Sequence, residues 1–318
     1  MGRTKLPAES PVGPAPIAPV AAGGAGGAVS AAAPVDFRTV IGVFKLRIGF
    51  LIMVTALAGL AIVPTGAVSG FQALVVALSV LLASAAAGAF NQYIEADSDR
   101  LMKRTRRRAF ASGALPCNGA WLAGIVALLV FAVAAAAWIV NPVSAGFVLL
   151  GALTYAGVYT VGLKRRTPWN IVIGGLSGSF AVLAGAAAAD PHIGPLAWLL
   201  AAVLFLWTPP HFWSLAIANE ADYRAAGVPM LPVVVGSARA ARIVHANTIL
   251  LVAVSLLPLL AGAGWIYGLG ALLGGAHFLR KTRALALEPS RQRAMAAFFA
   301  SMVQLSVLLA AVVIDAAR

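Results

Sequence analysis

The chain has 318 residues, of which 61% are hydrophobic and only 10% charged, and its formal net charge is +13. A soluble domain is about 45–50% apolar and about 25% charged, so this composition excludes a soluble globular protein. It indicates an all-α protein that crosses a membrane several times. Because Lys and Arg gather in the cytoplasmic loops of such proteins, the positive charge does not call for a nucleic-acid partner.

The first 36 residues are rich in Ala, Pro and Gly, and their only cations are Arg3 and Lys5. Such residues bury too little apolar surface to offset the entropy lost on ordering. We therefore expect 1–36 to be a disordered tail and 37–318 to form a single membrane domain. The tail has no apolar segment of the kind that marks a secretory signal.

Apolar stretches of about 20 residues, long enough to cross about 30 Å of hydrocarbon, predict a bundle of about nine transmembrane helices. They lie near residues 46–65, 70–92, 119–140, 143–162, 169–189, 195–218, 243–262, 264–280 and 296–315.

Lys and Arg are distributed on one side of this predicted bundle. They occur before the first helix and after each even-numbered helix, the loops after odd-numbered helices have none, and only Arg318 falls on the other side. Since cytoplasmic loops are enriched in these residues, we expect a cytoplasmic N-terminus and a C-terminus on the far side. Two of the cytoplasmic loops, 93–118 and 219–242, also hold five of the ten acidic residues.

The stretch "AFNQYIEADSDRLMKRTRRR", residues 89–108, runs from the end of the second predicted helix into the first of these loops. If the second helix extends past the membrane surface, Asn91, Glu95 and Asp99 are four residues apart and share one face. Asp97 then points away unless the helix unwinds. One or two carboxylates together with substrate phosphates suit Mg²⁺, and the lack of His or Cys beside them argues against zinc.

The cations that follow in 100–108 suit phosphate oxygens, so the loop predicts a site for Mg²⁺ and a diphosphate. The spacing alone leaves an alternative open. A solvated loop with topology-determining arginines and surface ion pairs would have the same pattern.

The second loop follows a helix that contains Pro209 and Pro210, and His211 comes next. Proline removes a backbone donor and kinks a helix, and a histidine within the membrane is a candidate functional residue. The alternative is a histidine whose polar atoms are satisfied by packing. The segment "VPMLPVVVG", residues 228–236, is too broken by proline to span the membrane.

Several separate blocks of the chain resemble one family. They are Asn91 to Asp99 with "MKRTRRR", "YTVGLKRRTPWNIVIGG" at 159–175, "WTPPHFW" at 207–213, and "DYRAAGVPMLPVVVG" at 222–236. From about residue 37 onward the sequence is similar to the heme O synthases (protoheme IX farnesyltransferases) of the UbiA superfamily of intramembrane prenyltransferases. The resemblance implies a nine-helix bundle with its acidic loops, and so its active site, on the cytoplasmic face.

The resemblance also implies an Mg²⁺-dependent transfer of farnesyl from farnesyl diphosphate, with addition of water, to a vinyl group of heme b. Carried onto this sequence, it places Asp97, Asp99 and Asp222 at catalytic acid positions; Asn91, Glu95, Asp99 and Asp222 on the metal; Asn91, Lys103, Arg104, Lys164 and Arg165 on the diphosphate; and His211 on the heme side.

Three features of the sequence bear on these roles. The family usually has Asp where this chain has Glu95. The second acidic motif of the wider superfamily commonly has two acids four apart, whereas here Ala226 stands four residues after Asp222, a reduction that the heme O synthases share. The usual Lys-Pro-Arg before the first helix reads Lys45-Leu46-Arg47, so the cations are kept and the proline is not.

Two rival functions remain at this point. The first is prenyl transfer to an aromatic quinone precursor, which would use the same acidic residues. A transporter would place acids near the bilayer midplane, whereas here they lie at helix ends. The expected partners are farnesyl diphosphate, heme b and the lipid bilayer, with a heme A synthase or a terminal oxidase receiving the product. Without a clear transit peptide, the composition favours a bacterial inner membrane over a mitochondrial one.

Overall fold

The computed structural model describes residues 36–63 and 68–318. Within these ranges all regular secondary structure is helical. The predicted disordered tail, apart from Asp36, lies outside the described residues.

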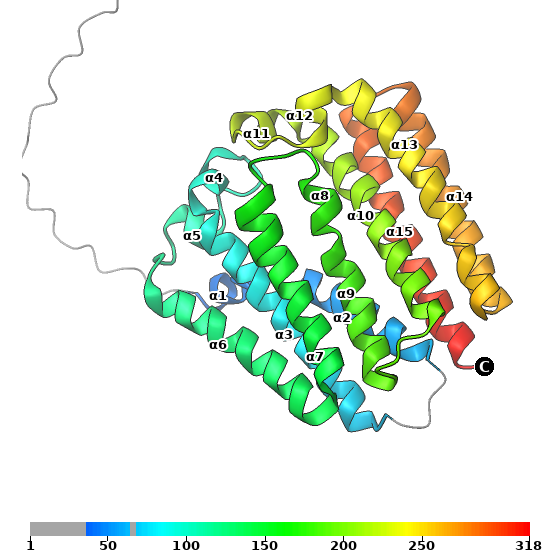
Figure 1. Cartoon of the computed structure of the whole chain (residues 1–318). Helices are drawn as coiled ribbons and strands as arrows, with labels where there is room; N and C mark the ends of the chain where they lie inside the picture. Colours follow the sequence, from blue (N-terminus) through cyan, green and yellow to red (C-terminus); the bar gives the residue numbers. More distant parts are fainter. Residues whose placement is uncertain (1–35, 64–67) are drawn as a thin grey trace, which may run out of the picture. The chain divides into compact units, whose positions relative to one another are not determined.

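The long helices pack side by side as a bundle (Figure 1). They are α2 (Leu46–Ala61), α3 (Gly70–Ile94), α6 (Gly119–Ala135) with the π-helix η1 (Ala136–Val140), α7 (Pro142–Leu153) with the π-helix η2 (Thr154–Leu163), α8 (Asn170–Gly174) with α9 (Leu176–Ala189), α10 (Pro195–Ala218), α13 (Ser237–Val254) with the 3₁₀-helix η3 (Leu257–Ala261), α14 (Trp265–Leu287) and α15 (Arg291–Ala316). Helix α9 packs against α2, α7 and α10, while α13 contacts α10 and α14, and α15 contacts α10 and α14.

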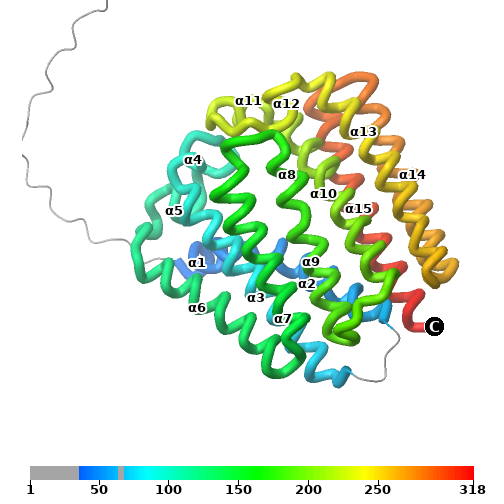
Figure 2. The backbone as a smooth tube through the Cα atoms, in the orientation of Figure 1, coloured from blue at the N-terminus to red at the C-terminus, as the bar shows by residue number. Residues whose placement is uncertain are grey.

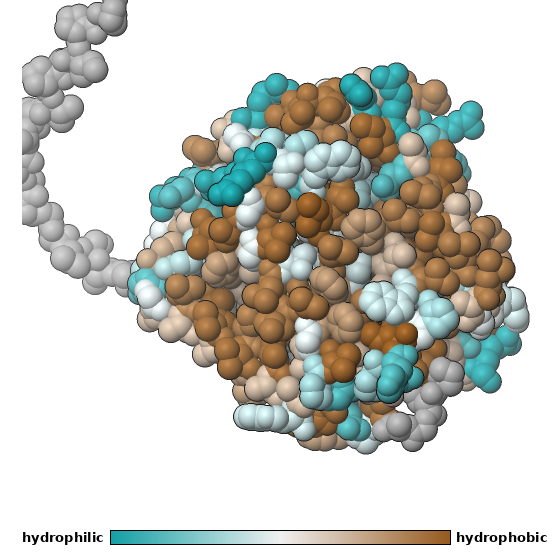
Figure 3. All heavy atoms as spheres, in the orientation of Figure 1, coloured by the Kyte–Doolittle hydropathy of each residue, from teal (hydrophilic) through white to brown (hydrophobic). Residues whose placement is uncertain are grey.

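Seven of these helical segments are long and apolar enough to cross a membrane, and an eighth is added if α1 (Phe37–Val43) and α2 form one span bent by 44°. On the face shown in Figure 3, a hydrophobic band lies between hydrophilic residues at its upper and lower edges. The structure therefore confirms a helical multi-pass protein. Helix α14, which carries Arg280, Lys281 and Arg283 near its end, is not among the seven, so nine spans remain a prediction.

Helices α2 and α9 approach so closely that no side chain fits between their backbones. A Cβ atom added to Gly185 would lie 1.8 Å from the carbonyl oxygen of Ala56, and one added to Gly59 would lie 2.1 Å from that of Val182. Small residues at such contacts let helix backbones pack directly, which is a main source of helix association in membranes.

Replacing Gly185 with alanine should therefore force α2 and α9 apart and destabilise the protein by about 1–3 kcal/mol, the usual cost of overpacking. Thermal unfolding of the purified protein in detergent measures this. Gly178→Ala in the same helix is the matched control, because nothing lies within 4 Å of its added Cβ. Equal melting temperatures for the two variants would contradict the close contact.

Four short helices lie at one end of the bundle (Figure 2). They are α4 (Ala96–Leu101), α5 (Ala109–Ser112), α11 (Glu220–Ala225) and α12 (Leu231–Val235). Met102, just after α4, shares one buried apolar cluster with Tyr223 of α11 and Met230 before α12. The two acidic loops thus meet, and "VPMLPVVVG" forms a turn and a short helix in agreement with the sequence.

Candidate active site

The buried acids lie where α3 passes into α4. Glu95 joins the two helices and the α-helical hydrogen bonds continue through it, from Glu95 N to Asn91 O (3.1 Å) and from Asp99 N to Glu95 O (2.8 Å). Asn91, Glu95 and Asp99 consequently share a face and are only 3%, 2% and 0% exposed. The shared face predicted from their spacing is confirmed.

Asp97 lies on the opposite side of α4. Its side chain is exposed and forms an ion pair with Arg100 at 2.9 Å, also on the surface. The structure thus keeps Asp97 apart from the buried acids, and its expected catalytic role remains a prediction. The helix does not unwind at this point, so Asp97 points away from the other acids and pairs with Arg100.

The π-helix η2 supplies the partners of two of the buried residues. Asn91 Nδ2 donates to Thr160 Oγ1 (3.1 Å), and Lys164 Nζ lies 2.5 Å from Glu95 Oε2. The backbone N–H of Lys164 donates to Tyr159 O, five residues earlier, as in a π-helix. Such segments are rare and frequent at functional sites. Thr160 was not predicted, since nothing in its sequence context indicates a π-helix.

Asp99 leaves one carboxylate oxygen without a protein partner. Its Oδ2 accepts from Arg108 Nη1 at 2.7 Å, whereas Oδ1 is buried and makes no hydrogen bond with a described residue. Buried polar atoms nearly always have a partner. A carboxylate oxygen in this state suits a cation such as Mg²⁺. Arg108 belongs to the predicted basic run but was not singled out in it.

Lys45, at the break between α1 and α2, is the third cation of the cluster. Its Nζ donates to Asn91 Oδ1 at 2.8 Å. The cluster of Lys45, Asn91, Glu95, Asp99, Arg108, Thr160 and Lys164 thus holds three cations and two carboxylates.

Burial lowers the pKa of Lys164 from its usual value, and the nearby Arg108 acts in the same direction. The carboxylates of Glu95 and Asp99 oppose this effect. The two carboxylates thus offset part of the cost of burying the Lys164 ammonium group.

The other predicted phosphate-binding cations lie on the surface. Lys103, Arg104 and Arg165 are exposed, and no ion pair is found for them within the described ranges. In the sequence they follow α4 and Lys164 directly, but their side chains are not part of the buried cluster.

The second acidic loop is nearby but does not complete a carboxylate cluster. Asp222 is partly buried in α11. Glu220 forms an ion pair with Arg224 and accepts a hydrogen bond from Ser237 at 2.5 Å. No three His, Cys, Asp or Glu side chains gather as a metal site among the described residues. The structure thus does not bring Asp222 together with Glu95 and Asp99.

His211 lies in an aromatic cluster between α10 and α15. Its ring stacks on Trp207 (4.2 Å between centroids) and Phe298 (4.6 Å), and its Nδ1 is 2.6 Å from Ser301 Oγ. Helix α10 is continuous through Pro209 and Pro210. One ring nitrogen therefore already has a protein partner, which is the arrangement expected for a packed histidine. The predicted role on the heme side remains untested.

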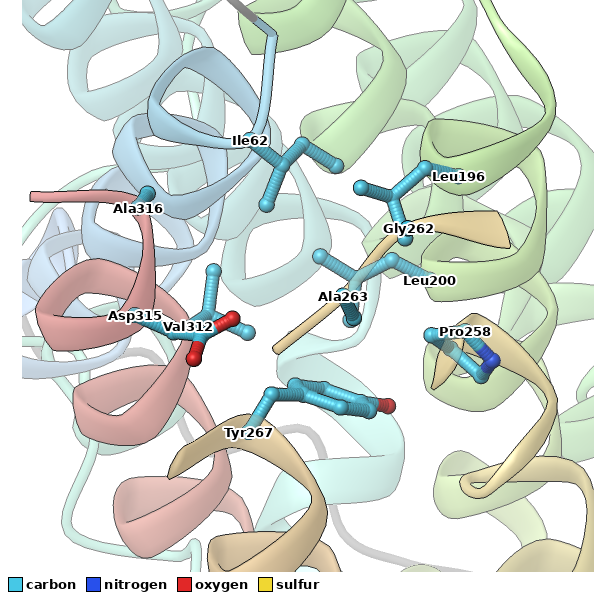
Figure 4. A pocket seen from close by; sticks show the side chains of 10 residues that line it. All are labelled: Ile62, Leu196, Leu200, Pro258, Gly262, Ala263, Tyr267, Val312, Asp315 and Ala316. Atoms are coloured by element: carbon cyan, nitrogen blue, oxygen red, sulfur yellow. The ribbon is translucent and has the colours of Figure 1, made fainter. Parts of the chain in front are cut away.

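A cavity of about 110 Å³ lies near the C-terminal end of α15 (Figure 4). Asp315 is the only acid or base among its lining residues, and its carboxylate accepts a hydrogen bond from the backbone N–H of Gly264 at 2.5 Å. Because that carboxylate is engaged, the cavity does not resemble the charged cluster at α3 and α4.

The charged cluster has the composition of a site for a polyanion with a divalent metal. Its cations suit phosphate oxygens, and the unpartnered Asp99 oxygen, the Glu95 carboxylate and the Asn91 amide oxygen are hard ligands of the kind that Mg²⁺ prefers. Its position at the end of an apolar bundle would let an apolar group enter the bundle while the anion stays at the surface.

Comparison with known proteins identifies the family from the sequence. Residues 52–303 match the model of the UbiA prenyltransferase family. The chain is 56% identical over 281 residues to protoheme IX farnesyltransferase 2 of Paramagnetospirillum magneticum, covering 88% of this chain and 97% of that protein. It is 37% identical to protoheme IX farnesyltransferase of Beijerinckia indica, covering 90% and 89%.

Solved structures show the same fold. A digeranylgeranylglyceryl phosphate synthase superposes with a TM-score of 0.72 at 18% identity, over 88% of this chain and 98% of that chain. A UbiA homolog from Archaeoglobus fulgidus bound to GPP and Mg²⁺ superposes with a TM-score of 0.65 at 16% identity, over 86% and 99%. At these identities the likeness is one of fold.

Proposed function

Since this chain belongs to the UbiA prenyltransferase family, in its protoheme IX farnesyltransferase branch, we propose that it makes heme O. It transfers the farnesyl group of farnesyl diphosphate, with addition of water, to a vinyl group of heme b and releases diphosphate. The observation that carries this proposal is the cluster of Lys45, Glu95, Asp99, Arg108 and Lys164, in which Glu95, Asp99 and Lys164 are buried and Lys45 and Arg108 partly so, and which provides cations and a free carboxylate oxygen in one place.

The cations of the cluster stabilise the leaving diphosphate. Negative charge grows on its oxygens as the bond to farnesyl breaks, and groups placed in advance where charge develops lower the barrier most. Arg108 and Lys164 lie inside the cluster, and the exposed Lys103, Arg104 and Arg165 add charge from the surface. Burial of the cluster also keeps water away until the vinyl group has reacted.

Asn91, Glu95 and Asp99 are the residues that fit Mg²⁺, whereas the structure holds Asp222 apart from Glu95 and Asp99, so a part for Asp222 in the metal site remains a prediction from the sequence. The fit rests on the Asp99 oxygen that makes no hydrogen bond within residues 36–63 and 68–318. It is supported by the Archaeoglobus fulgidus homolog, which was solved with GPP and Mg²⁺. The ion would supply charge neutralisation at the diphosphate. Of the remaining candidates, we assign Asp97 to holding Arg100 and His211 to the heme side.

The acceptor is tested with the purified full-length protein in lipid nanodiscs, given farnesyl diphosphate, Mg²⁺ and either heme b or 4-hydroxybenzoate. We expect heme O from heme b and no farnesylated 4-hydroxybenzoate, both detected by liquid chromatography with mass spectrometry. If 4-hydroxybenzoate were prenylated and no heme O formed, the chain would be a prenyltransferase that acts on aromatic quinone precursors.

We further propose nine spans, with α14 as the eighth, in a bacterial inner membrane with the active site on the cytoplasmic face. The one-sided distribution of Lys and Arg, before the first predicted helix and after the even-numbered ones, supports this orientation. A heme A synthase or a terminal oxidase then receives the heme O. Residues 37–318 act as one membrane domain.

Cys117 allows a direct test of the orientation. It is the single cysteine of the chain, it is exposed, and it precedes α6 at the end that carries the acidic loops. A membrane-impermeant maleimide should leave Cys117 unlabelled in intact spheroplasts and label it in inside-out vesicles. Labelling in intact spheroplasts would place the active site on the outer face.

Glu95→Asp is expected to keep heme O synthesis within about tenfold of the wild type, because the shorter carboxylate retains its charge opposite Lys164 and charge dominates such a pair. The yield of heme O per membrane-inserted protein measures this. Glu95→Gln, of equal length but neutral, is the matched control and should lose far more. If Glu95→Gln made more heme O than Glu95→Asp, the length of the Glu95 side chain, rather than its charge, would determine activity.

A further inference from the structure

The first membrane helix is interrupted at Lys45. The residue has φ = 48° and ψ = 42°, the left-handed conformation, and it is the only non-glycine residue with positive φ among those described. This conformation is unfavourable for a residue with a Cβ atom. Strained backbone of this kind persists only where the surroundings hold it, and it is frequent at ligand sites.

Helix α3 holds the break in place. Gln92 Nε2 donates to the carbonyl oxygens of Gly42 (3.1 Å) and Val43 (2.8 Å) at the end of α1. The side chain of Lys45 passes over Gly88, where an added Cβ would lie 3.5 Å from Lys45 Cδ. The break therefore directs the lysine across α3 toward the buried acids.

Lys45 differs from the other two cations of the cluster in its partner. Lys164 is paired with Glu95 and Arg108 with Asp99, whereas Lys45 Nζ donates to the neutral amide oxygen of Asn91 and has no ion pair among the described residues. A lysine that donates to a neutral amide has no carboxylate partner to give up when an anionic ligand binds.

The orientation of Asn91 is fixed by a second contact. Its Nδ2 donates to Thr160 Oγ1 (3.1 Å), and the Thr160 hydroxyl donates to Tyr155 O (2.8 Å). Asn91 Oδ1 therefore points at Lys45. While Lys45 donates to Asn91 Oδ1, that oxygen is not available as a metal ligand. The ammonium group of Lys45 would also repel a metal ion placed beside it.

We propose that Lys45 binds the diphosphate, and that its move from Asn91 Oδ1 to a phosphate oxygen releases that amide oxygen for the metal. The inference rests on the proposed function and adds how the binding of the diphosphate and the binding of the metal depend on each other. Binding of the diphosphate favours binding of the metal through Lys45, and by linkage the metal favours the diphosphate equally.

The test uses the full-length protein in nanodiscs and two probes, a non-reacting thiolo analogue of farnesyl diphosphate and Mn²⁺. Analogue affinity is measured by calorimetry with Mg²⁺ present, and affinity for Mn²⁺ alone by electron paramagnetic resonance. Lys45→Met should weaken analogue binding roughly 10- to 100-fold, as expected for loss of a charged hydrogen bond. It should also tighten binding of Mn²⁺ alone, because Asn91 Oδ1 is then free.

Opposite changes in the two affinities distinguish a ligand from a structural residue, whose loss would weaken both. Lys45→Gly provides the second variant, since glycine adopts the left-handed conformation without strain and keeps the break while removing the charge. It should behave like Lys45→Met. Arg47→Met, which removes an exposed cation two residues away, is the matched control and should leave both affinities unchanged.

If Lys45→Gly and Lys45→Met bind the analogue as the wild type does, Lys45 does not bind the diphosphate and the proposed function stands. If both probes bind more weakly to the two variants, Lys45 acts through the structure and the inference is wrong. If the wild type itself fails to bind the analogue with Mg²⁺, the proposed function and the inference both fail.

Discussion

Asp99→Asn is expected to abolish heme O formation. Asp99 is fully buried, one oxygen accepts from Arg108 and the other makes no hydrogen bond with any residue that the structure describes. Asparagine has nearly the same shape but no charge, so the metal and Arg108 lose their anionic partner. A metal contributes several kcal/mol of charge stabilisation, and we therefore expect a loss of at least about 100-fold.

The measurement is heme chromatography of membranes from cells that lack their own heme O synthase and express the variant. Immunoblotting of the membranes checks that the variant is inserted. Asp190→Asn is the matched control, because this exposed acid precedes α10 and is remote in sequence from both acidic loops. Normal heme O from Asp99→Asn would remove Asp99 from the metal site.

Lys164→Met should cost both stability and activity. Lys164 and Glu95 form a buried ion pair at 2.5 Å, with side chains 10% and 2% exposed. Removing one partner of a buried pair leaves an uncompensated charge and destabilises a protein by about 3–5 kcal/mol. We expect a clear fall in the melting temperature in detergent and no detectable heme O, because the diphosphate also loses a cation.

A second substitution separates the two effects. In Lys164→Met with Glu95→Gln the buried charge is gone, so the melting temperature should recover while heme O remains absent. Arg166→Met, an exposed cation two residues away, should melt as the wild type does. If the double variant melts as low as Lys164→Met, the unpaired Glu95 is not the cause of the destabilisation.

The shared face of Asn91, Glu95 and Asp99 was predictable because α-helical hydrogen bonds continue from α3 into α4. Spacing of four residues has a structural meaning only in that regular geometry. The same reasoning correctly left Asp97 on the other face. The helix ends were also predicted closely where polar loops follow long apolar runs, as for α3 and α10.

The partners of those acids were beyond the same reasoning. Thr160 and Lys164 face α3 because η2 is wound as a π-helix, and an apolar segment wound in this way has no distinct sequence period. Lys45 enters the cluster through a left-handed break held by Gln92, a tertiary effect. For this reason the sequence spacing could not decide between a diphosphate site and a solvated loop, and the resemblance to heme O synthases decided it.

The central claim is tested most directly by heme chromatography of cells that lack their own heme O synthase and express this chain. The account predicts a heme O peak that is absent from cells with the empty vector and from cells with Asp99→Asn. Its identity is checked by the mass of heme b plus one farnesyl group and one hydroxyl group. Membranes that contain the folded protein but only heme b would contradict the account.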